Sequence, residues 1–117
     1  MDLPDISAFI NHKEILRDTL AGINKDFVCI GEEEVMPEQA VPTFEGLLDA
    51  IHPILDNLYH NKYQLFLALM YKVDISEATL DNAKEKSRVD LVKEIAVLIV
   101  KRELQKAVSR NFYKNQQ

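Results

Sequence analysis

The chain has few of the residues that usually mark a catalytic, metal-binding or membrane-spanning sequence. Its single cysteine, Cys29, excludes an internal disulfide and a metal site built from several cysteines. Its longest apolar run falls far short of the roughly 20 residues that a membrane-spanning helix needs. The sequence also lacks a glycine-rich phosphate loop, a nucleophile elbow and an HExxH zinc motif. We therefore expect no enzyme activity, no cofactor and no metal.

The first residues also lack the pattern of an export signal. The segment MDLPDISAF carries two aspartates and Pro4 where a secretory signal would have a basic segment leading into an apolar one. We therefore expect a cytoplasmic protein that does not associate with membranes.

The composition and periodicity indicate one all-α domain. The 117 residues are 47% hydrophobic and 28% charged, which is typical of a single globular domain, here residues 1–117. Most of the chain repeats its apolar residues at helical spacing. We expect a bundle of about five helices, with a long acidic loop between the first two helices and a long C-terminal helix.

The first helix is predicted over residues 5–29. Its apolar positions recur at steps of three, four or seven residues, at Ile6, Phe9, Leu16, Leu20, Ile23, Phe27 and Ile30. Pro4 and Asp5 suit the first helical turn, and Gly31 suits a left-handed terminator. Residues 27–30, FVCI, are rich in strand formers and could be extended, but the continuous phase favours a helix.

Residues 31–43 contain two prolines and four glutamates without any period, and they predict a long loop that acts as a connector. Thr43 is the expected N-cap of the second helix. Pro53 lies within the pattern of that helix, where it should cause a kink rather than a break, because the phase continues beyond it.

The second half of the chain predicts three more helices. Asn61 and Gln64 resemble a capping box before a helix that is apolar over most of its girth, which predicts burial on more than one side. Ser76 is the expected N-cap of a short fourth helix. Ser87 with Asp90 should open the last helix, which extends to about residue 112.

The last helix carries two apolar stripes. The first contains Leu91, Val92, Ile95, Leu98 and Ile99, and the second contains Val97, Val100, Leu104 and Val108. The second stripe is a candidate interaction surface, because it is covered either by other helices of the same chain or by a second chain. A buried strand at Ile95–Val100 is the alternative, but the flanking segments are good helix formers.

A basic ridge follows on the same helix at Arg102, Lys106, Arg110 and Lys114. It could contact phosphate or an acidic partner, although cations near a helix C-terminus are also favoured by the helix dipole. Net charge is −9 over residues 1–60 and +4 over residues 61–117. This uneven distribution is explained either by attraction between the two halves or by a basic contact surface.

Two further groups of side chains are candidates for ligand chemistry. His52, Asp56 and His60 share one face of the second helix, but a rise of 1.5 Å per residue keeps the two histidines about 12 Å apart, too far to chelate one ion. We expect a solvated polar face there. Tyr59, Tyr63, Phe66 and Tyr71 either pack in the core or line a groove between the second and third helices.

These observations favour a small helical protein-interaction domain without catalytic activity that binds a protein partner or forms a homodimer. The alternatives are a nucleic-acid-associated protein using the basic ridge, or a small-molecule binder using the aromatic groove.

Overall fold

A computed structural model describes residues 6–86 and 90–115, with side chains described as far as Phe112. These residues form five helices and no strand, which confirms the predicted all-α class. The helices are α1 (Lys13–Cys29), α2 (Phe44–Asn61), α3 (Tyr63–Val73), α4 (Glu77–Lys86) and α5 (Leu91–Asn115).

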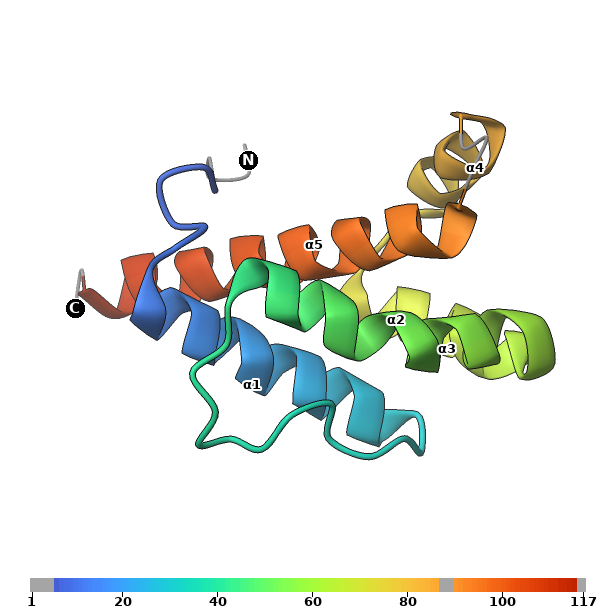
Figure 1. Ribbon diagram of the computed structural model, residues 1–117. Coiled ribbons are helices and arrows are strands. Elements are labelled where there is room, and N and C mark those ends of the chain that lie inside the picture. The colour runs from blue at the N-terminus through green and yellow to red at the C-terminus, as the bar shows by residue number, and fades with distance from the viewer. Residues whose placement is uncertain (1–5, 87–89, 116–117) are drawn as a thin grey trace.

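The helices are arranged around α5, which contacts each of the other four. Figure 1 shows α5 running the length of the bundle with α1 and α2 beside it. α2 and α3 form an antiparallel hairpin at one end, and α3 packs on α1, α2 and α5. α4 packs mainly on α5 and rises away from the other helices (Figure 1). One continuous core joins α1, α2, α3 and α5, and its largest fully buried side chains include Phe27, Phe66, Leu20, Ile23, Leu47, Ile51, Leu55, Leu58, Leu69, Ile95, Ile99 and Leu104.

The first helix begins later than predicted, because His12 caps it. The imidazole Nδ1 of His12 accepts a hydrogen bond from the backbone N–H of Ile15 at 3.3 Å, and the His12 backbone is extended. Before this cap, Ile6 and Phe9 pack on the core from a pair of turns rather than from a helix. Residues 6–12 therefore keep the apolar spacing of a helix although they do not form one. Pro4 and Asp5, the predicted first turn, lie outside the described residues.

The end of α1 at Cys29 follows the prediction. Phe27 to Cys29 are helical rather than extended, Ile30 is the C-cap, and Gly31 has a φ of +94°. Residues 31–43 form no helix or strand. Asn24 fixes this loop, because its side chain donates to the Met36 carbonyl at 2.9 Å and accepts from the Val35 N–H at 2.8 Å.

Two of the predicted caps are confirmed and one is wrong. The hydroxyl of Thr43 accepts from the Gly46 N–H at 2.9 Å, and that of Ser76 accepts from the Thr79 N–H at 3.1 Å. The capping box at Asn61 does not form, because Lys62 is the N-cap of α3 and the Asn61 amide donates to Asn57 instead.

α2 follows the sequence pattern, whereas α5 begins three residues later than the predicted Ser87 cap would place it. α2 continues through Pro53 as one helix. Asp90 caps α5 by accepting from the Lys93 N–H at 3.1 Å, whereas Ser87 lies outside the described residues.

Candidate functional site

The predicted interaction stripe of α5 lies mostly inside the molecule. Val100, Leu104 and Val108 are buried in the core, and Val97 is half-buried beside α4. α1, α2 and α3 of the same chain cover this side of α5. Of the two arrangements expected from the sequence, cover by the same chain or by a second chain, the structure has the first. The three buried valine and leucine side chains are therefore not available to a second chain, which corrects their assignment as an interaction surface.

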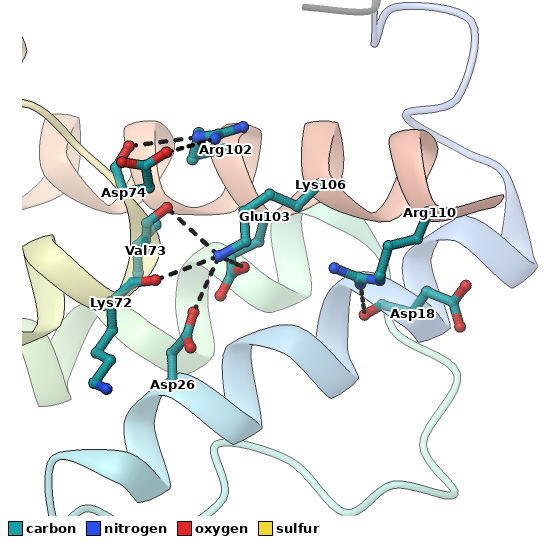
Figure 2. Close-up of polar contacts among 9 residues, drawn as sticks. All are labelled: Asp18, Asp26, Lys72, Val73, Asp74, Arg102, Glu103, Lys106 and Arg110. Atoms are coloured by element: carbon teal, nitrogen blue, oxygen red, sulfur yellow. Dashed lines mark hydrogen bonds and ion pairs between the residues drawn. The ribbon is translucent and has the colours of Figure 1, made fainter. Parts of the chain in front are cut away.

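The side chains of the basic ridge of α5 make contacts within the chain. Arg102 donates to the carboxylate of Asp74 at 2.8 Å, and Arg110 donates to the Asp18 carbonyl at 3.3 Å. Lys106 lies between α1, α3 and α5 (Figure 2). The side chain of Lys114 lies outside the described residues. These contacts engage the ridge within the chain. The Lys106–Asp26 pair joins the acidic first half to the basic second half, whereas Asp74 belongs to the second half itself.

Lys106 is the centre of a buried charge cluster. Its Nζ lies 2.9 Å from Oε1 of Glu103 and 3.3 Å from Oδ2 of Asp26. The same ammonium group donates to the backbone carbonyls of Lys72 and Val73, each at 3.5 Å. Figure 2 shows these groups converging from α1, the end of α3, and α5. One cation thus ties three helices together.

Glu103 is the most unusual group in this cluster. Only 1% of its surface is exposed, and neither carboxyl oxygen has a hydrogen-bond partner of good geometry among the described residues. Burial, and then the neighbouring Asp26, raise the pKa of Glu103 to about 8, although Lys106 opposes the rise. Gly22 faces the carboxyl group closely, because a Cβ there would lie 3.2 Å from Oε1. Burial and the neighbouring carboxylate thus both favour the protonated form of Glu103.

The cluster also fixes the C-terminal end of α3. Lys106 binds two of the last carbonyls of that helix, and Arg102 binds the side chain of the C-cap residue Asp74 as well as its carbonyl, at 3.4 Å. Unpaired carbonyls and the negative end of the helix dipole both favour cations at this place. Arg102 also lowers the pKa of Asp74. Two residues of the basic ridge, Arg102 and Lys106, thus bind the C-terminal end of α3 within the same chain.

The helix held in this way exposes a large apolar face, which we name the outer face of α3. Tyr63, Leu67 and Tyr71 form one row of this face at four-residue spacing, with Ala68 beside them. The exposed Leu65 lies apart from this row, beyond the exposed Gln64 and Lys72. Tyr71 is 82% exposed, and Tyr63, Leu65 and Leu67 are each 38–39% exposed. Phe66, Leu69, Met70 and Val73 fill the opposite, buried side. The prediction that this helix is buried on more than one side is therefore wrong, because α4 packs mainly on α5 and reaches α3 through Lys84 at Tyr63.

The aromatic groove predicted between α2 and α3 is filled by its own rings. Tyr59 contacts Tyr63 and Phe66 edge-on, with ring centroids 5.7 and 5.2 Å apart. Lys84 of α4 donates to the hydroxyl of Tyr63 at 3.0 Å. Tyr71 lies away from these rings on the outer face.

The histidines of α2 pair with carboxylates rather than with each other. His60 lies 3.4 Å from Asp56, and His52 lies 3.4 Å from Asp90. No group of three or more His, Cys, Asp or Glu within residues 6–86 and 90–112 is arranged to hold a metal ion.

Two adjoining cavities lie between α4 and α5. Their volumes are about 470 and 330 Å³, and both are lined by Thr79 and Leu98. The larger one also meets Lys101 and Gln105, and the smaller one meets Val97. Half-buried apolar side chains therefore line a partly polar groove that the sequence did not predict.

The comparisons give no relative. No protein-family model, no curated protein and no solved structure matches this chain. Across the described part of the chain, no helix is long and apolar enough to cross a membrane.

Proposed function

We propose that this protein is a protein-interaction domain whose contact surface is the outer face of α3. The observation that carries the proposal is the concentration of exposed apolar side chains there. Of the seven large hydrophobic residues exposed among those described, four lie on this single helix of 11 residues. Scattered apolar residues are normal on a surface, whereas a contiguous group usually marks a binding site.

The support from α5 suits this role. Arg102 and Lys106 hold the C-terminal end of α3, and Phe66 and Leu69 fix its inner side in the core. The outer face is therefore presented by a helix anchored on one side and at one end. A rigid surface lowers the entropy cost of binding a partner.

Nucleic-acid binding is the weaker alternative. Arg102 and Lys106 already contact Asp74, Asp26 and Glu103, so binding phosphate would break those pairs. The absence of enzyme activity and the cytoplasmic location stay predictions.

The proposal is tested by placing a photo-crosslinking amino acid at Tyr71 and irradiating cells that produce the protein. We expect a discrete crosslinked species from position 71. The matched control is the same replacement at Val41, which is also an exposed apolar residue but lies in the loop before α2. Equal or absent crosslinking at the two positions would refute the proposal.

A second function, binding of a small molecule or a peptide in the α4/α5 groove, is favoured by the two adjoining cavities. Cavities of 300–1,000 Å³ are typical of ligand sites. A ligand screen by NMR should shift the amides of Thr79 and Leu98 first, and a screen that moves neither would count against it.

A further inference from the structure

We propose that the α4/α5 groove binds a medium-chain carboxylate, with the carboxylate group at Lys101 and the aliphatic chain along Leu98 and Val97. This inference rests on the second proposed function, because it names the class of ligand that the groove takes.

The first support is the shape of the groove. Val97, Leu98, Lys101 and Gln105 lie on one face of α5, because their spacings of three, four and seven residues follow the helical turn. Thr79 of α4 and Leu98 line both cavities, so the two spaces adjoin between the helices. Their volumes of about 470 and 330 Å³ are those of small-molecule sites, which favours a small molecule over a peptide.

The second support is apolar surface that the core does not use. Val97 and Leu98 are half-buried, and they belong neither to the core of the described residues nor to the side chains packed against it. Ala83 and Ile75 complete the apolar lining. Among the described residues, no aromatic ring lines either cavity. The lining therefore offers contact area to an aliphatic chain and no ring on which an aromatic ligand could stack.

The third support is a positive charge without a counter-ion at one end of the groove. Lys101 is exposed and has no ion pair or hydrogen bond with another described residue. Asp74 and Arg102 line the same end, but they bind each other at 2.8 Å. The N-cap Ser76 places the N-terminal end of α4 there too, where the helix dipole favours an anion.

This charge pattern selects a single negative charge on the ligand. A carboxylate carries one charge at pH 7, whereas a phosphate monoester carries about 1.5 to 2. At the other end of the groove, the opposite charges of Lys86 and Glu94 offer the ligand no net charge. Glu94 lies seven residues before Lys101, or about 10 Å along the helix axis, and this distance limits the length of chain that the groove covers.

The first experiment is an NMR titration of the purified chain with sodium octanoate at pH 7, below the concentration at which octanoate forms micelles. We expect saturable shifts of the Thr79, Leu98 and Lys101 amides, with a dissociation constant on the order of 1 mM for so small a ligand. Acetate keeps the head group without the chain, and 1-octanol keeps the chain without the charge. Both should bind about threefold or more weakly, and octanoate binding no tighter than either control would overturn the inference.

The second experiment tests the position of the carboxylate. Lys101→Met should weaken octanoate binding about two- to fivefold at low salt and leave the binding of 1-octanol unchanged. Lys93→Met removes the same charge from an exposed position of α5 that lines neither cavity, and it should change neither ligand. Equal effects of the two variants on octanoate would contradict a carboxylate site at Lys101.

The third experiment tests the position of the chain. Leu98→Gln should weaken octanoate binding about fivefold, because it replaces apolar lining with an amide, whereas Leu65→Gln on α3 should have no effect. In the parent chain, each methylene added between hexanoate and octanoate should tighten binding by up to about fourfold. An affinity that does not depend on chain length, or equal effects of the two variants, would contradict this placement.

Failure of this inference is distinguishable from failure of the second proposed function. If peptides or uncharged molecules shift the amides of Thr79 and Leu98 and no carboxylate does, the ligand class is wrong and the groove remains a binding site. If no ligand shifts either amide, both the ligand class and the binding function of the groove are wrong.

Discussion

Lys106 of α5 and Asp26 of α1 are 80 positions apart in the chain, and their charged atoms lie 3.3 Å apart at the point where α1, α3 and α5 meet. Both side chains are largely withdrawn from water. The contact is therefore an internal link between the acidic first half of the chain and its basic second half. It also places Asp26 near Glu103, so that two carboxyl groups share one ammonium group.

The raised pKa of Glu103 predicts a stability that falls as pH rises. Between the ordinary value of 4.5 and about 8, the folded state binds a proton on Glu103 that the unfolded state has lost, so each pH unit in this window lowers the free energy of unfolding. The expected loss is about 3 kcal/mol between pH 6 and pH 9. This loss of stability should be complete once the pH exceeds the pKa of Glu103 in the folded state.

Glu103→Gln tests this assignment, because glutamine keeps the shape without titrating. Urea unfolding at pH 6 and pH 9 should show that the variant loses most of the pH-dependent difference seen in the parent. Glu94→Gln, an exposed change on the same helix, should retain it. A parent whose stability is constant over this range would show that Glu103 titrates normally.

Removing the cation of the cluster should be costly. Lys106→Met leaves Asp26 facing Glu103 without a counter-ion, and it leaves the carbonyls of Lys72 and Val73 without their donor. We expect a loss of about 2 to 3 kcal/mol at pH 7, because Lys106 retains some exposure to water. Chemical denaturation should show less than about 0.5 kcal/mol for the exposed control Lys101→Met. Similar losses for both would show that the cluster does not stabilise the fold.

The sequence predicted the helices better than their surroundings. Local signals determine where helices end, and the Thr43 cap, the Ser76 cap and the Gly31 terminator were all readable from them. His12 was missed because histidine is a rare cap and the apolar spacing continues before it.

The candidate site was harder to predict because it depends on tertiary packing. A basic ridge on a helix looks the same whether it meets solvent or an acidic helix, and only the position of Asp26 and Asp74 decides between these. The sequence shows that α3 carries apolar residues on most sides. Which side of α3 stays uncovered depended on where α4 packs, and no local pattern encodes that.

The anchor of the long acidic loop gives a separate prediction. Asn24 makes two hydrogen bonds to the loop backbone from a nearly buried position. Asn24→Ala should therefore lower the free energy of unfolding by about 2 kcal/mol and speed proteolysis within residues 31–43. Asn82→Ala on α4 is the exposed control for both measurements. Unchanged proteolysis in Asn24→Ala would show that these two bonds do not order the loop.

The two leucines at positions 67 and 69 test whether the outer face of α3 is separate from the core. Leu69 is fully buried, whereas Leu67 is 39% exposed two residues earlier on the same helix. Leu69→Ala should cost about 3 kcal/mol of unfolding free energy, because it opens a cavity, and Leu67→Ala should cost less than about 1 kcal/mol. Thermal and urea unfolding measure both changes. A loss at Leu67 as large as that at Leu69 would mean that this leucine belongs to the core, and the surface on which the interaction proposal depends would shrink to Tyr71 and its neighbours.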